Sequence, residues 1–241
     1  MLIALYGAYH GGGAVMHARL LQVDRIVVRG TERLSIGEVL AVLSGLRGEN
    51  IVWTDLSAWR LRLLSSPWVR DAALRRLLPS TVEVVVSERQ PVGVARIDGG
   101  LYLVDDRAVV IDEYGPQYAD FDLPIIDGLT SSAAAAGART DAARAELAAR
   151  LIASLGSRPE VARRVSQVDV SDQHNAAVIL SGDPAVLYVG EDRFLSRLQS
   201  YLDLVEALRE RVQQIDYVDL RFDDRIYVRP VGAPRSELAR R

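Results

Sequence analysis

The segment "SPWVRDAALRRLLPSTVEVVVSERQPVG", residues 66–93, predicts two consecutive strands followed by a domain boundary. Residues 69–77 form the first strand, which ends at a turn favoured by Pro79 and the serine after it. Residues 81–89 form the second strand, and three alternating valines lie on one face because side chains change sides at every residue. An apolar strand face of this kind needs a second layer, so the neighbouring sequence should supply helices.

The sequence before this segment supplies a strand and two helices. Residues 21–30 alternate apolar and polar side chains and end in a glycine, which is typical of a strand. Ser35 and Glu38 have the spacing of a capping box, which starts an amphipathic helix. A second helix is predicted to begin near Thr54 or Asp55. The order β-α-α-β-β predicts a three-stranded sheet backed by two helices.

The sequence changes after "RQPVG" to short strands separated by turns, which indicates a second domain. An alanine-rich stretch, residues 131–157, contains a linker followed by a helix with evenly spaced leucines. Another helix is predicted over about residues 193–211. We therefore expect an α+β chain: a β-α-α-β-β domain at residues 22–90, and a mixed, mainly antiparallel β domain with flanking helices at residues 91–230.

The two ends of the chain read differently from these domains. Residues 1–21 begin with a short apolar run that is broken by His10 and a triple glycine, whereas a spanning helix needs about 20 apolar residues. This segment is either the remnant of a membrane anchor or a flexible leader of a soluble protein. Residues 231–241 form a charged tail.

The last strands are predicted from "IDYVDLRFDDRIYVRP", residues 215–230. A three-residue loop at Asp223, Asp224 and Arg225 would give the hairpin one apolar face, with the arginine near left-handed geometry. That face would carry Val218, Leu220, Phe222, Ile226 and Val228. The outer strand of this hairpin would be a sheet edge, open unless something covers it.

Composition excludes several classes of protein. All 29 basic residues are arginine and there is no cysteine, so chemistry that needs a lysine amine or a thiol has no candidate. The net charge of −3 and the aromatic content of 6% argue against a nucleic-acid surface. The paired acids lie in or beside predicted turns, where aspartate is structurally favoured, and the three histidines are scattered. We expect no catalytic site, metal or cofactor.

Several motifs together resemble the bacterial cell-division FtsQ/DivIB family. Residues 66–93 carry P-W-V, an arginine-bearing strand, P-x-T-V, an apolar strand ending in E-R, and P-V, which resemble the second half of that family's POTRA domain. "VDRIVVRG" with "LSIGEVL" resembles the first strand and helix of this domain. "LYLVD", "LPIIDGL" and "IDYVDLRFDDRIYV" are similar to parts of the family's β domain. The resemblance covers roughly residues 22–230.

The resemblance implies a non-catalytic scaffold of the divisome, with one inner-membrane anchor and its bulk on the periplasmic side at the septum. It implies that the last strand pairs with a strand of FtsB, in the FtsB and FtsL complex. The implied contact residues are Phe222, Asp224, Ile226, Tyr227, Val228 and Arg229. A second implied surface, for upstream division proteins, is one face of the second POTRA strand carrying Asp71, Leu74 and Arg76. The resemblance also suggests FtsK, FtsW and FtsI as further partners.

Two other functions stay open at the level of sequence. A POTRA module of an envelope translocation system would receive unfolded client strands, but it should lead into a membrane barrel, and no series of long alternating strands follows residue 90. A cell-wall enzyme could use Asp105 or Asp223 as an acid or base, although both lie in predicted turns.

Overall fold

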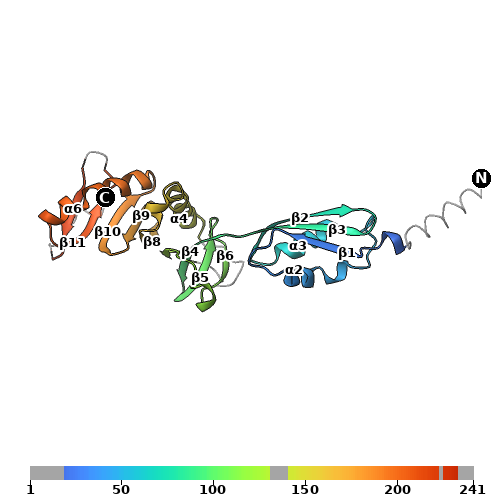
Figure 1. The fold of residues 1–241 in the computed structure, drawn as a ribbon. Coiled ribbons are helices and arrows are strands. Elements are labelled where there is room, and N and C mark those ends of the chain that lie inside the picture. The colour runs from blue at the N-terminus through green and yellow to red at the C-terminus, as the bar shows by residue number, and fades with distance from the viewer. Residues whose placement is uncertain (1–18, 131–140, 223–224, 233–241) are drawn as a thin grey trace, which may run out of the picture. The chain divides into compact units, whose positions relative to one another are not determined.

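A computed structural model describes residues 19–130, 141–222 and 225–232. The chain separates into two compact units, Met1–Arg89 and Gln90–Arg241, and each is described by itself (Figure 1). No helix in the described ranges is both long enough and apolar enough to cross a membrane.

The first unit is a three-stranded sheet with helices on one face. Its elements are η1 (Arg19–Leu21), β1 (Arg25–Arg29), α2 (Ile36–Val42), η2 (Ser44–Leu46), α3 (Leu56–Leu64), β2 (Val69–Leu77) and β3 (Thr81–Glu88). The strand order is β1-β3-β2, with β1 parallel and β2 antiparallel to the central strand. The predicted β-α-α-β-β order is confirmed.

The helices of the first unit begin where local chemistry predicts. Ser35 and Glu38 form the capping box at the start of α2, and Asp55 caps α3 by accepting from the Ser57 backbone N–H. The core between the helices and the sheet contains the three predicted valines of β3. Its buried members include Val82, Val84, Val86, Val39, Leu43, Trp59 and Leu63.

The loop between β1 and α2 is fixed by a buried carboxylate that sequence analysis did not single out. Glu88, the last residue of β3, accepts hydrogen bonds of 2.9 Å from the backbone N–H groups of Glu32, Arg33 and Leu34. These three donors precede the α2 cap and have no partner within a helix, so the glutamate satisfies them. One end of the central strand therefore holds the entry to the first helix.

The second unit is built on a nine-stranded sheet. Its strands are β4 (Pro91–Ile97), β5 (Gly100–Asp105), β6 (Val110–Glu113), β7 (Ile125–Asp127), β8 (Val165–Asp172), β9 (Asn175–Leu180), β10 (Asp183–Gly190), β11 (Ile215–Asp219) and β12 (Tyr227–Pro230). The order across the sheet is β12-β11-β10-β9-β8-β7-β4-β5-β6. Five of the neighbouring pairs are antiparallel and three are parallel, so the expected mixed, mainly antiparallel sheet is confirmed.

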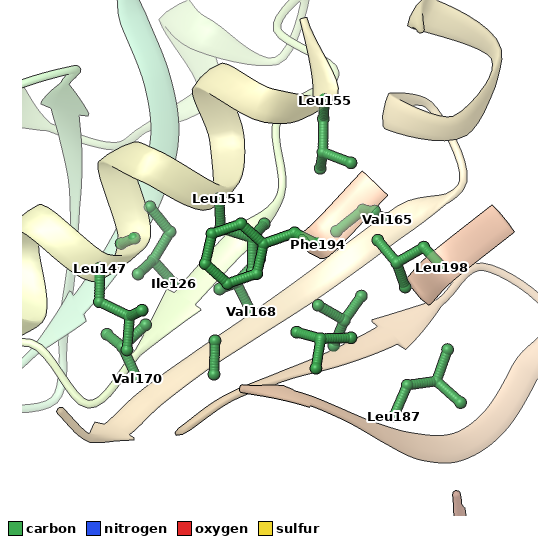
Figure 2. Packing of buried hydrophobic residues seen from close by; sticks show 14 of the residues in the cluster. Ile126, Leu147, Leu151, Leu155, Val165, Val168, Val170, Leu187, Phe194 and Leu198 are labelled. Atoms are coloured by element: carbon green, nitrogen blue, oxygen red, sulfur yellow. The ribbon is translucent and has the colours of Figure 1, made fainter. Parts of the chain in front are cut away.

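Helices cover one face of this sheet. They are α4 (Ala142–Leu155), α5 (Pro159–Ala162) and α6 (Phe194–Arg211), with the short η3 (Pro116–Tyr118) elsewhere. α4 and α6 contact each other as well as the strands beneath them. Figure 2 shows Leu147, Leu151 and Leu155 of α4 pointing toward Phe194 and the sheet. The predicted leucine spacing is thus the buried stripe of α4, while the predicted alanine-rich linker lies outside the described residues.

Gly30 offers a direct test of the first unit's packing. Its φ is +80°, and a Cβ added there would lie 2.2 Å from the carbonyl oxygen of Val86. Gly48 has a similar φ of +84° but open space around it. We expect Gly48→Ala to cost about 1 kcal/mol through left-handed geometry alone, and Gly30→Ala to cost at least about twice as much because β3 must also move.

The measurement is urea unfolding followed by tryptophan fluorescence. The three tryptophans, Trp53, Trp59 and Trp68, all belong to the first unit, so their emission reports this unit alone. If Gly30→Ala and Gly48→Ala lowered the free energy of unfolding equally, the steric role given to Gly30 would be contradicted.

Candidate partner-binding edge

The final strand of the chain lies at one end of the nine-stranded sheet. β12 pairs antiparallel with β11 on its inner side, and no described strand pairs with its outer side. A strand in this position presents backbone N–H and C=O groups that can add another strand. The edge is therefore the first candidate for a binding site.

The direction of each backbone group along β12 follows from one hydrogen bond. The Val231 N–H donates to the Gln214 carbonyl oxygen at 3.0 Å, so residue 231 bonds inward. Since bonding residues alternate along an antiparallel strand, Tyr227 and Arg229 also bond inward, while Val228 and Pro230 present their backbone groups outward. Proline has no N–H to lose at an outward position, which explains how Pro230 fits an edge strand without breaking the hairpin.

The predicted three-residue hairpin loop is wrong in its register. Val218 pairs with Val228 and Asp219 pairs with Tyr227, whereas a three-residue loop would pair Leu220 with Val228. The strands therefore separate earlier, after Asp219. The physical reason lies in Asp219, which is buried and accepts from the Arg221 backbone and guanidinium at 2.6–3.1 Å, turning the chain away from the ladder. The ion pair raises the pKa of Arg221.

The even shift in register preserves most of the predicted apolar face. Val218 and Leu220 are buried, and Ile226 and Val228 pack against the same core. Phe222 differs: it is 48% exposed, and its ring meets Tyr227 edge to face with centroids 5.1 Å apart. The aromatic pair thus stands on the surface beside the edge strand.

The other predicted contact residues are Arg229, Asp224, Ile226 and Val228. Arg229 places its guanidinium 5.7 Å from the Tyr217 ring and 3.7 Å from the Asp216 carboxylate. Asp224, with Asp223, lies outside the described residues. The structure therefore brings Phe222, Tyr227 and the strand backbone together, while the side chains of Ile226 and Val228 turn toward the core.

A hollow beside the edge was missed by sequence analysis. It has a volume of about 570 Å³ and lies between α6 and the chain that connects β11 to β12. Its lining combines apolar side chains with three arginines, of which Arg193 and Arg197 pair with Asp192. The lining residues are Arg193, Ser196, Arg197, Ser200, Leu204, Leu220, Phe222, Arg225 and Ile226. Residues from α6 and from the connection come together only in the folded chain, so no local pattern indicates this hollow.

The three residues predicted on one face of the second POTRA strand do not share a face. Asp71 pairs with Ser87, while Leu74 and Arg76 pair with Val84 and Val82 on the helix-covered side. Strand alternation separates odd from even positions, so the prediction of a common face is wrong. That these residues bind a partner is still a prediction.

Each of the three also has a structural contact. Asp71 pairs with Arg60 at 2.5 Å, and this hydrogen bond lowers the pKa of the carboxyl. Leu74 packs against the core, and Arg76 donates to the Ile51 and Thr54 carbonyl oxygens at 2.6 and 2.5 Å.

Of the two acids considered for catalysis, Asp105 has a structural role, and Asp223 lies outside the described residues. Asp105 is buried and accepts from the backbone N–H groups of Arg107 and Val109, which fixes the turn between β5 and β6. Among the described residues, no three acids or histidines are grouped closely enough to hold a metal ion. The structural interpretation of Asp105 agrees with its turn position.

The architecture defines the class of this protein: a POTRA-type unit followed by an α+β unit whose long sheet ends in an open strand. Residues 21–89 match the POTRA domain of FtsQ type, and residues 93–221 match the C-terminal domain of cell division protein FtsQ/DivIB. The second match covers more than half of the chain. The chain belongs to the FtsQ/DivIB family of cell division proteins.

Two relatives named cell division protein FtsQ agree with this assignment. Cell division protein FtsQ of Koribacter versatilis is 31% identical over 221 residues, covering 90% of this chain and 63% of that protein. FtsQ of an Anaeromyxobacter species is 31% identical over 242 residues, covering 96% and 79%. The solved extracytoplasmic domain of DivIB from Geobacillus stearothermophilus is 15% identical with a TM-score of 0.35, covering 52% of this chain and 98% of that one. The chain spans somewhat under two thirds of the Koribacter relative.

Glu83 gives the first unit a pH dependence that can be measured. It is buried on the sheet face opposite the helices, between Arg29 at 3.2 Å and Arg75. The hydrogen bond from Arg75 lowers the pKa of Glu83 below its ordinary value of 4.5. Because the folded pKa is the lower one, the ionised carboxylate stabilises the fold above the ordinary pKa, and this contribution is lost as pH falls through the folded pKa.

We therefore expect Glu83→Gln to reduce the stability of the first unit at pH 7 and to flatten its loss of stability on acidification. Urea unfolding by tryptophan fluorescence between neutral and acid pH measures both effects. Glu32→Gln, which changes an exposed glutamate of the same unit, is the control. If the stability of Glu83→Gln and that of the unmodified chain changed with pH in the same way, the proposed contribution of the ion pairs would be ruled out.

Proposed function

We propose that this chain is a non-catalytic scaffold of the bacterial divisome that binds FtsB, within the FtsB and FtsL complex, by adding a partner strand to β12. Through its two units it would link early and late division proteins. The observation that carries this proposal is the unpaired outer side of β12 in the described sheet. Strand addition uses main-chain hydrogen bonds for affinity and nearby side chains for specificity.

The main-chain part of the contact is short. Val228 offers both an outward N–H and an outward C=O, whereas Pro230 offers only its C=O. The partner strand would therefore form backbone hydrogen bonds at Val228, and this pairing would end near Pro230. Such a short ladder limits how many hydrogen bonds the edge itself contributes.

Side chains beside the ladder would supply the rest of the contact. Phe222 and Tyr227 form an exposed aromatic pair, and aromatic side chains are favoured at interface hot spots. Of the three arginines that line the neighbouring hollow, Arg193 and Arg197 pair with Asp192, and Arg225 donates to the Tyr227 hydroxyl. Arg225, beside the aromatic pair, would suit an acidic residue flanking the partner strand. Asp224 and Arg229 belong to the same proposed contact by their positions in the sequence.

The remaining features of the proposal concern location and other partners. We propose that residues 1–21 belong to an inner-membrane anchor, that residues 22–90 and 91–230 are the two periplasmic domains, and that the chain acts at the septum. Asp71 and Arg76, which are exposed on opposite faces of β2, and the partly buried Leu74 are proposed contacts for upstream division proteins. FtsK, FtsW and FtsI are proposed as further partners, with no surface assigned to them.

The edge contact can be tested by removing one outward backbone donor. Val228→Pro deletes the outward N–H but leaves the inward bonds of Tyr227 and Arg229 in place. Val228→Ala shortens the same side chain and keeps the N–H, so it is the matched control. The measurement is titration calorimetry with the purified extracytoplasmic FtsB and FtsL complex of the same cell. Val228→Pro should lower the affinity for this complex at least about tenfold, and Val228→Ala should lower it much less.

Thermal unfolding of both variants checks that the hairpin remains folded. If both variants bind like the unmodified chain, the added strand does not use this edge. If the unmodified chain does not bind the complex, the proposed partner is wrong.

A further inference from the structure

One end of the first unit carries exposed apolar side chains from three separate segments. We name this group the tip patch; it consists of Leu20 in η1, Val52 and Trp53 before α3, and Leu77 and Leu78 at the end of β2. Leu20, Trp53 and Leu78 are 77%, 70% and 68% exposed. Figure 1 shows η1 and the connection from β2 to β3 at the same end of this unit.

Hydrogen bonds hold the three segments of the tip patch against one another. The Ile51 N–H donates to the Leu21 carbonyl oxygen at 2.8 Å, which ties η1 to the loop before α3. Arg76 donates to carbonyl oxygens on both sides of Trp53, at Ile51 and Thr54, which ties that loop to β2. The patch is therefore a fixed surface of the fold rather than a set of unrelated side chains.

The fold itself does not need these side chains. Ile51, next to Val52, is completely buried and anchors the loop in the core, as does Leu46 in the preceding turn. A hollow of about 550 Å³ opens beside Leu20, with Arg47 and Pro79 among its lining residues. Of the tip patch, only Leu20 lines this hollow. Exposed apolar groups gathered at one end of a domain indicate a contact surface.

We infer that the tip patch inserts into the surface of a lipid bilayer. The described chain begins at this end with η1, and residues 1–18, which contain the apolar run "MLIALY", precede it. Residues 7–18 are twelve residues and can span at most about 40 Å. An exposed tryptophan at the same end as exposed leucines suits the interface of a bilayer, where indole rings are enriched. The inference rests on the proposed location of the chain beside a membrane.

The charges near the patch predict how lipid composition matters. Arg25, Arg47 and Arg76 are exposed at this end, and they are opposed by the exposed acids Asp24 and Asp55 and the half-buried Glu49. Insertion should therefore depend mainly on apolar burial and only weakly on anionic lipid.

The absence of cysteine from the sequence allows a single dye to report on one position. Leu78→Cys places an environment-sensitive fluorophore in the patch. Ile36→Cys places it at the start of α2, at the opposite end of the unit, where the side chain is also exposed, at 54%. Both labelled chains are mixed with vesicles of phosphatidylcholine, alone or with phosphatidylglycerol, with and without quenchers on the acyl chains.

With either lipid mixture, the dye in the Leu78→Cys variant should shift to shorter wavelength and be quenched from within the bilayer, and the dye in the Ile36→Cys variant should do neither. Adding Leu20→Ser and Trp53→Ser should weaken the vesicle binding reported by the dye at position 78 about tenfold or more. Circular dichroism confirms that each variant is folded.

Three results would overturn the inference. In the first, vesicles bind the chain but neither dye responds, which would mean that residues 1–18 bind alone. In the second, both dyes respond, which indicates non-specific adsorption. In the third, the chain does not bind vesicles at all. None of these involves the FtsB and FtsL complex, so the edge-strand titration can still succeed when the tip patch fails, and the two failures are distinguishable.

Discussion

The parallel pairing of β10 with β11 determines where the second unit ends. Parallel neighbours need a crossover, and α6 supplies it across the face that α4 already covers. After that crossover β11 lies outermost, so the next strand can pair only on its free side and becomes the edge. The availability of β12 is therefore a consequence of how α6 packs: Phe194, Leu198 and Tyr201 bury this helix in the core and hold β11 in place.

Buried carboxylates fix the connections that the sheets leave open. Glu88 holds the entry to α2, Asp105 holds the turn after β5, and Asp219 turns the chain after β11. Asp183 accepts from the Tyr201 hydroxyl at 2.6 Å and pairs with Arg209 at 3.1 Å, and burial raises the pKa of Tyr201. Each buried acid is bonded to donors, as low polarity requires. In both units, these buried acids therefore hold connections and helices in place.

The sequence predicts the elements of this fold better than their register. Caps and apolar spacing identify α2, α3 and α4, because these signals are local and follow from helix geometry. The predicted register of the last hairpin was wrong because Asp219 bonds to Arg221 and ends the ladder early. Strand alternation in the sequence does not reveal this interaction. The shared face of Asp71, Leu74 and Arg76 was taken from a family resemblance, whereas the alternation of the strand itself separates them.

Binding surfaces were harder to predict, for a related reason. The edge strand could be identified because it ends a run of alternating residues. The hollow between α6 and Phe222 and the tip patch could not, since each joins segments far apart in the sequence. Backbone pairing of distant segments, such as Ile51 with Leu21, creates these surfaces. A single sequence shows only local patterns, such as apolar periodicity and helix caps, so surfaces built from distant segments cannot be read from it.

The two edges of the nine-stranded sheet differ in how they resist unwanted pairing. β6 buries Val110 and Ile111 and ends in two acids, so little of its edge is apolar and accessible. β12 is only four residues long and carries Pro230 at an outward position, which prevents a long ladder from forming. An edge that offers so few outward backbone groups cannot by itself select a partner, because those groups are the same in every chain. Under the proposed strand addition, selectivity would therefore come from the side chains around β12, chiefly the Phe222–Tyr227 pair and the hollow beside α6.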